Sequence, residues 1–316
     1  MARVDPIVTE TSPSVLAGWA AGESSLPPFS VAAIVTEARL QTWIGVALVV
    51  AAALYLYGVY RMRLRGDRWP VTRTAFFLVG GVGGIASVTV TGIGTYDTTL
   101  LSVHMVQHMV LAMVAPIFLA LGAPVTLALR TLTGAPRRWL LALVHSRYVR
   151  LVTHPLVAFG LVILNPFALY FTDLYRLSLE NTVVHEFIHV HFLITGCVFY
   201  WPLIGLDPLP RRWPYPARGL LMVLSVPFHT VLGLTIMQST TLVGGDWYPS
   251  LGLSWADPWV DQKVAGGILW AGGEAVSVVM LGVLLVQWVR HAEREARRID
   301  RELDRQEARA RMSAGS

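Results

Sequence analysis

The sequence predicts an all-α membrane protein built as a bundle of about seven transmembrane helices. Hydrophobic residues make up 54% of the 316 residues, charged residues only 14%, and the mean hydropathy is +0.55. This composition is far from that of soluble domains. Apolar runs also recur at about 20 residues, the length that spans the hydrocarbon core of a bilayer as a helix. The strands of a membrane barrel are shorter and alternate in polarity, so a barrel is excluded.

Seven such runs follow one another along the chain. They cover residues 42–60, 74–94, 98–122, 152–171, 182–201, 218–240 and 264–289. We expect each run to form one helix of a single membrane domain, residues 39–290. Residues 1–38 begin with a stretch rich in Ser, Pro, Gly and Thr, and are expected to form an extracytoplasmic tail that is loosely attached or disordered. No cleaved signal peptide is expected, because no basic region precedes an apolar stretch there.

Arginine is distributed unevenly among the connections between these runs. The connections after the first, third and fifth runs are rich in arginine, whereas the alternate connections hold only Arg176 and Lys263. Because cytoplasmic loops are enriched in Lys and Arg, the N-terminus is predicted outside and the C-terminus in the cytoplasm. Residues 291–316 mix Arg and Glu at helical spacing, and we expect a charged cytoplasmic tail that continues the last helix. Since the arginines follow the topology, they do not indicate nucleic-acid binding.

Two of the predicted helices carry histidine pairs at i,i+4 spacing, which places both rings on one helix face. His104 and His108 lie in the third run, and His185 and His189 lie in the fifth. Polar, metal-binding side chains are costly inside a bilayer, so they usually face the bundle interior and serve a function. The predicted topology places all four in the outer half of the membrane, where we expect them to hold one metal ion. His191 faces away from His189 and is either a second contact or structural.

Further candidate ligands lie at similar predicted depth. Met105 and Met109 flank the first histidine pair, Met237 lies near the outer end of the sixth run, and His229 and Glu274 lie near mid-membrane. Thioethers select Cu(I), whereas imidazole serves several transition metals. Copper as Cu(I) is therefore the predicted metal, with zinc less favoured, although both flanking methionines can also serve as packing. His229 and Glu274 are expected to pair and to tune the site or relay protons.

Several short motifs succeed one another across five of the predicted helices. They are His104-Met105-Val106-Gln107-His108-Met109, then His185 and His189 to His191 leading to Tyr200-Trp201-Pro202, then Gly205-Leu206-Asp207-Pro208, then Pro227-Phe228-His229, and finally Asp261-Gln262-Lys263-Val264-Ala265-Gly266-Gly267-Ile268-Leu269-Trp270. In order and spacing they resemble the seven-helix CtaG-type cytochrome c oxidase assembly factors of bacteria, over about residues 40–290. The resemblance implies a multi-pass plasma-membrane protein that helps mature a haem–copper oxidase by supplying copper. Its implied partners are cytochrome c oxidase subunits and other copper chaperones.

Three other functions fit parts of the sequence. His185-Glu186-Phe187-Ile188-His189 matches HExxH, the zinc metalloprotease signature. Such an enzyme needs a third ligand, and no Asp lies within the sixth or seventh run. Histidines on facing helices also ligate haem in redox proteins. A copper permease needs a polar path to the cytoplasm, and the inner halves of these runs are nearly all apolar. A non-enzymatic copper-binding assembly factor is therefore the leading hypothesis.

Overall fold

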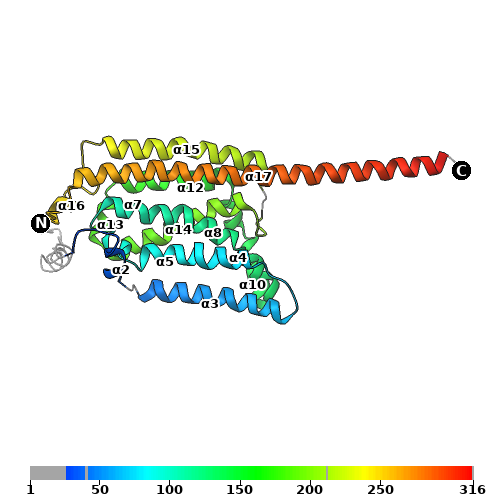
Figure 1. The fold of residues 1–316 in the computed structure, drawn as a ribbon, viewed down its shortest axis with the longest axis horizontal. Helices are drawn as coiled ribbons and strands as arrows, with labels where there is room; N and C mark the ends of the chain where they lie inside the picture. The colour runs from blue at the N-terminus through cyan, green and yellow to red at the C-terminus, as the bar shows by residue number, and fades with distance from the viewer. Residues whose placement is uncertain (1–25, 40–41, 211–212, 315–316) are drawn as a thin grey trace, which may run out of the picture.

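The computed structural model describes residues 26–39, 42–210 and 213–314, and the secondary structure of these parts is helical, with no strand. In chain order the helices are α2 (Ala33–Thr36), α3 (Thr42–Leu64), α4 (Val71–Ala75), η1 (Phe76–Val82), α5 (Gly83–Thr89), α6 (Ile93–Tyr96), α7 (Leu101–Met109), η2 (Val110–Val114), α8 (Ala115–Leu121), α9 (Pro124–Thr131), α10 (Gly134–Val144), α11 (Arg147–Val152), α12 (Pro155–Tyr170), α13 (Leu174–Glu180), α14 (Thr182–Ile204), α15 (Tyr215–Gln238), α16 (Trp247–Ser250) and α17 (Pro258–Ala314). Both η segments are π-helical. Figure 1 shows the long helices lying side by side as one bundle, from which α17 projects.

Within the described residues, six helical stretches are long and apolar enough to cross a membrane. They are Trp43–Leu64, Val71–Thr89, Leu101–Thr131, Thr182–Ile204, Tyr215–Gln238 and Pro258–Gln306. The fourth predicted span is α12, which has only 16 residues and is bent by 63° from the helices before it. Pro155 begins α12, and a proline lacks the N–H that would continue the preceding helix. The bundle of six to seven spanning helices agrees with the prediction.

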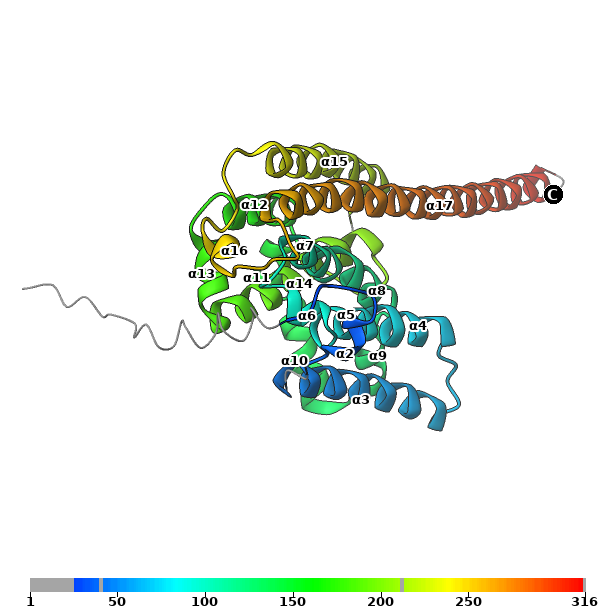
Figure 2. The same cartoon turned by 60° about the vertical axis from the view of Figure 1, so that its left-hand side comes forward.

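Short helices gather at the end of the bundle where α7 and α14 begin (Figure 1). Part of the expected N-terminal tail packs here, and Figure 2 shows α2 beside α6. Leu26 and Ala33 are buried, and the Tyr96 hydroxyl donates a hydrogen bond to the Pro27 carbonyl oxygen (2.6 Å). The described part of this segment is therefore attached to the bundle, while residues 1–25 lie outside the described residues.

The last span continues without a break through the charged C-terminal segment. α17 has 57 residues, and its side chains from 290 to 306 are all exposed. Arg298 and Glu302 form an i,i+4 ion pair on this part (3.1 Å). The charged segment thus continues the last helix as expected, and its cytoplasmic location stays a prediction.

A close approach of two spans brings the histidine-bearing helices together. Pro116 has no N–H to donate, and its ring conflicts with the carbonyl of Ala112 four residues earlier. The third span accordingly widens into the π-turns of η2 before α8 begins. On α14, a Cβ at Gly196 would lie 2.2 Å from the Ala112 carbonyl oxygen. Only glycine fits at this position, so the two helices meet at backbone contact.

A second glycine contact joins α15 to α17 and yields a stability prediction. A Cβ on Gly266 would lie 2.5 Å from the Gly233 carbonyl oxygen, whereas one on Gly267 meets nothing within 4 Å. Because the backbone must shift to admit the methyl group, we expect Gly266→Ala to destabilise the fold by about 1–3 kcal/mol. Gly267→Ala is the matched control and should change stability little. The two variants are compared by thermal unfolding in the same detergent. Equal unfolding midpoints would contradict the close contact between α15 and α17.

Candidate metal centre

The two histidine pairs lie next to each other in the bundle interior. The ring centroids of His104 and His185 are 5.6 Å apart, and those of His108 and His189 are 6.0 Å apart. Within each pair the centroids are 4.0 and 4.4 Å apart. All four side chains are buried. Helix spacing and topology therefore place these residues together as the sequence suggests, and their role as metal ligands stays a prediction.

Asp97 joins the histidines from the connection between α6 and α7. Its Oδ2 atom lies 3.1 Å from His185 Nε2 and 3.7 Å from His189 Nε2. Each of the three residues offers a ligand atom within 4.8 Å of the others. Burial raises the pKa of Asp97, but the neighbouring His185 and His189 outweigh that effect, and the pKa ends below its ordinary value. Asp97 is therefore a carboxylate at neutral pH within a buried two-histidine, one-carboxylate group.

Asp97 is not among the predicted ligands, because the prediction is confined to the apolar runs. A signal for it exists in the sequence. Asp97 is an acidic residue in the short connection directly before the helix that carries His104. The same topology that places His104 and His185 near the outer ends of their helices also places this connection beside them.

Most of the ring nitrogens in the cluster lack a hydrogen-bond partner. Among the described residues, six of the eight nitrogens of His104, His108, His185 and His189 have none. The other two are His185 Nε2, which faces Asp97, and His108 Nδ1, which lies 3.0 Å from the Tyr170 hydroxyl. A buried polar atom without a partner costs about 1–3 kcal/mol, and folded proteins rarely leave one. Imidazole nitrogens beside a carboxylate suit copper or zinc, which would bind one nitrogen of a ring.

Two buried tyrosines, Tyr175 of α13 and Tyr248 of α16, cover one side of the site. The Tyr175 ring packs edge-on against His104 (centroids 4.9 Å apart), and its hydroxyl is hydrogen-bonded to that of Tyr248. Burial raises the pKa of both phenols, so each keeps its proton. These rings therefore shield the histidines from water without adding charge.

Glu186 lies at the edge of the cluster, next to a cavity. Its Oε2 atom is 3.6 Å from His189 Nδ1, and neither carboxylate oxygen has a hydrogen-bond partner among the described residues. A cavity of about 160 Å³ is lined by Asp97, His185 and Glu186, together with Arg39 from the N-terminal segment. The cavity lies at the end of the bundle where α7 and α14 begin, beside Asp97 and His185.

Two other predicted ligands make contacts elsewhere. His191 is half-buried on another side of α14, where it stacks on Phe187 (centroids 5.9 Å apart, planes at 21°). The Met237 side chain lies across Gly266 of α17, with its Cγ 2.5 Å from the position of a Cβ on that glycine. The contacts of both residues are those of packing between helices or rings.

His229 and Glu274, expected to pair, bind different partners. Glu274 accepts hydrogen bonds from the Thr230 hydroxyl (2.7 Å) and the Trp270 indole (2.6 Å). His229 Nδ1 donates to the Ser225 carbonyl oxygen (3.0 Å). No hydrogen bond joins the two side chains among the described residues. The pairing is therefore wrong, because hydroxyl and indole donors nearer on α15 and α17 take the carboxylate.

The remaining predicted ligands share a separate, inner cavity. A cavity of about 40 Å³ is lined by Met105, His108, Met109 and His229, among other residues. Helices α7, α12, α14, α15 and α17 all contribute to its wall. The structure thus divides the predicted single site into a nitrogen–oxygen cluster and a sulfur-lined cavity, with His108 in both.

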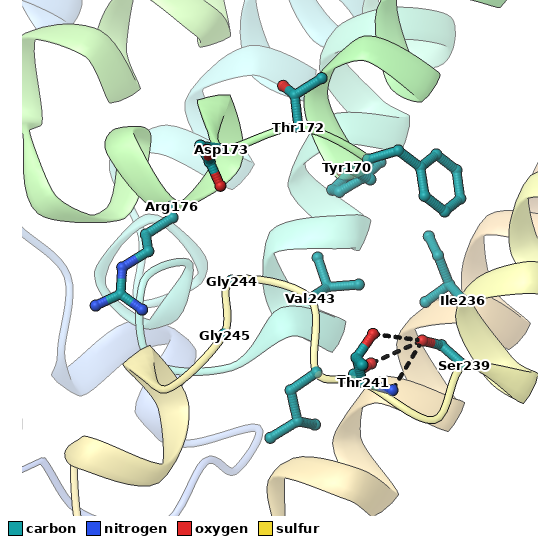
Figure 3. Close-up of a pocket in the computed structure, with 12 residues that line it drawn as sticks. Tyr170, Thr172, Asp173, Arg176, Ile236, Ser239, Thr241, Val243, Gly244 and Gly245 are labelled. Atoms are coloured by element: carbon teal, nitrogen blue, oxygen red, sulfur yellow. Dashed lines mark hydrogen bonds between the residues drawn. The ribbon is translucent and has the colours of Figure 1, made fainter.

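A larger pocket of about 620 Å³ lies at the ends of α12 and α15 and shares Tyr170 with the inner cavity. Figure 3 shows Tyr170, Thr172 and Asp173 above this pocket and Ser239 and Thr241 below it, with Gly245 next to Arg176. Tyr170 also contacts His108 through its hydroxyl. This ring therefore lies between the larger pocket and the inner cavity.

The family model described as cytochrome c oxidase caa3 assembly factor (Caa3_CtaG) matches residues 53–291. This chain belongs to the cytochrome c oxidase caa3 assembly factor family. The matched region contains Asp97 and all of the predicted ligands. The family assignment confirms the resemblance seen in the motifs, and the histidine cluster lies within the matched region.

Similar chains occur in mycobacteria. Uncharacterized proteins of Mycobacterium tuberculosis and Mycobacterium leprae are each 37% identical to this Caa3_CtaG-family chain over 285 residues. The aligned part is 88% of this chain but 43% of each relative, so the chain spans less than half the length of these curated relatives. No solved structure matches it significantly.

Proposed function

We propose that this assembly factor binds copper at the cluster of His104, His108, His185, His189 and Asp97 and supplies it to cytochrome c oxidase in the bacterial plasma membrane. One observation carries the proposal. Four buried imidazoles with unpartnered nitrogens lie together, and two of them face the Asp97 carboxylate, in a member of an oxidase assembly family. Buried ionisable groups inside a bundle are costly, and their concentration at one point supports a cation as cargo.

The position of the cluster suits delivery of the ion. The cavity beside Asp97 and Glu186 reaches the ligand atoms from the end of the bundle predicted to face outward. We infer that a copper chaperone loads the site from this side and that an oxidase subunit removes the ion. Such exchange needs a site that is accessible and of moderate affinity, which fits a cluster near the ends of α7 and α14.

The size of the cavities favours a metal ion over haem or a quinone. The two cavities that the clustered histidines line have volumes of about 160 and 40 Å³. Pockets for organic ligands typically measure about 300–1,000 Å³. An ion with its ligands needs no such space.

Copper titration of the purified full-length protein tests the proposal. Cu(I) in competition with a chromophoric chelator should bind wild-type protein, and His104→Ala should weaken binding by about 10- to 100-fold, as is usual around metal sites. His191→Ala is the matched control, since His191 stacks on Phe187 outside the cluster, and its affinity should be unchanged. Equal affinities of wild type and His104→Ala would refute the assignment.

A second candidate function, an intramembrane metalloprotease, is favoured by one contact. Asp97 supplies the third ligand that HExxH requires, and Glu186 lies close to His189. Glu186→Gln separates the two functions, because the amide cannot act as a general base. If the protein delivers copper, a strain carrying Glu186→Gln should retain mature oxidase. Loss of function with metal binding intact would favour the protease.

A further inference from the structure

The inner cavity differs chemically from the histidine–carboxylate cluster that precedes it along α7 and α14. The cluster offers nitrogen and oxygen atoms from His185, His189 and Asp97. The inner cavity instead presents thioethers, since Met109 and Met113 line it in addition to Met105. Met109 and Met113 follow both histidines of α7 in sequence, so they lie further along the third span, in α7 and η2.

His108 is oriented by the Tyr170 hydroxyl. The hydroxyl oxygen lies 3.0 Å from His108 Nδ1 and 3.5 Å from the Met105 sulfur. His108 Nε2 has no hydrogen-bond partner among the described residues. Tyr170 therefore holds one ring nitrogen and leaves the other open, as is common for metal-ligating imidazoles.

The tautomer of His229 is fixed by a contact within its own helix. A backbone carbonyl only accepts, so His229 Nδ1 carries the proton in its contact with Ser225 (3.0 Å). His229 Nε2 is left with a lone pair, and the residue lines the cavity. Asn165 also lines it, and its Nδ2 has no hydrogen-bond partner among the described residues. The cavity thus combines imidazole nitrogens and thioethers.

We propose that this cavity is a second metal site, selective for a soft monovalent cation and held by Met105, Met109, Met113, His108 and His229. Thioethers with imidazole select Cu(I) over divalent ions. The volume of about 40 Å³ accommodates an ion, since even a water molecule needs only about 10–15 Å³. The inference rests on the proposed function in taking copper as the cargo. His108 lies between the two sites, and its one free nitrogen serves one of them at a time.

The chain offers matched variants for a test. Met105→Leu/Met109→Leu conserves volume and removes only the sulfur atoms. Met222→Leu/Met280→Leu is the control, because both residues are buried in the same hydrophobic core without lining the cavity. His229→Gln is a third variant, which removes a ligand from a different helix and guards against a packing effect of the leucines. Purified full-length protein is titrated with Ag(I) and, separately, with Zn(II).

Wild type and the Met222→Leu/Met280→Leu control are expected to bind about two Ag(I) ions but about one Zn(II) ion. Met105→Leu/Met109→Leu and His229→Gln should each lose one Ag(I) and retain Zn(II). X-ray absorption of the Cu(I)-loaded protein should show sulfur neighbours that vanish in the double leucine variant. An unchanged number of bound Ag(I) ions in both cavity variants would overturn the inner site. So would sulfur neighbours that persist in Met105→Leu/Met109→Leu. Failure of wild type to bind either metal would overturn the proposed function itself.

Discussion

Replacing His185 and His189 together by alanine is expected to abolish copper binding at the histidine–carboxylate cluster. Maturation of the oxidase should be lost with it. The change removes both nitrogens that face the Asp97 carboxylate. Loss of one group near a metal weakens binding by about 10- to 100-fold, and because the two rings are neighbours their combined loss is not a simple product. Chelator competition measures the affinity, and the oxidase spectrum of a complemented deletion strain measures maturation.

Loss of the two rings also removes both imidazoles that face the buried Asp97 carboxylate, which by itself destabilises a protein. His185→Gln/His189→Gln retains polar groups near the carboxylate and separates folding from binding. His145→Ala, at the exposed end of α10, is the control for histidine removal in general. Full copper affinity in the folded glutamine variant would exclude these residues as ligands.

Gly196→Val is expected to disrupt the bundle and the metal centre at once. The new Cβ would lie 2.2 Å from the Ala112 carbonyl oxygen and 2.7 Å from Pro116 Cγ, and neither is a flexible group. α14 must move away from the third span, and that movement separates His189 from His108. We expect a destabilisation above about 3 kcal/mol, the range of severe overpacking.

The control for this prediction is Gly160→Val in α12, where a Cβ meets nothing within 4 Å. Yield, thermal unfolding and Cu(I) affinity are compared in one detergent. Gly196→Val protein with the yield and copper affinity of the control would show that the close approach of α14 to the third span does not build the site.

The histidine pairs could be predicted because helix geometry and membrane depth are both encoded locally. An i,i+4 spacing fixes a common face for His104 and His108. The arginine content of the connections predicts which end of each helix faces outward, and the position in the helix then gives the depth. The same local information also predicted the continuation of α17 through the charged C-terminal segment. Local rules sufficed here because each of these features lies within one helix.

Asp97 and the division of the site could not be predicted in this way. Asp97 belongs to no apolar run, and its role depends on which helix ends meet. The sequence placed His229 and Glu274 at equal depth, but depth alone does not set rotation about the helix axis. Packing decided that rotation, and Thr230 and Trp270 took the carboxylate.

By itself the sequence determined the helical membrane fold, the two histidine faces and the resemblance to oxidase assembly factors. Only the tertiary structure decided which atoms meet. The contact of Gly196 with the Ala112 carbonyl brings α14 to the third span. The Tyr170 hydroxyl contacts Nδ1 of His108, whose Nε2 has no hydrogen-bond partner among the described residues. The physical reason is that periodicity fixes a face and a depth along one helix, whereas distances between helices arise from side-chain volume and hydrogen-bond competition across the bundle.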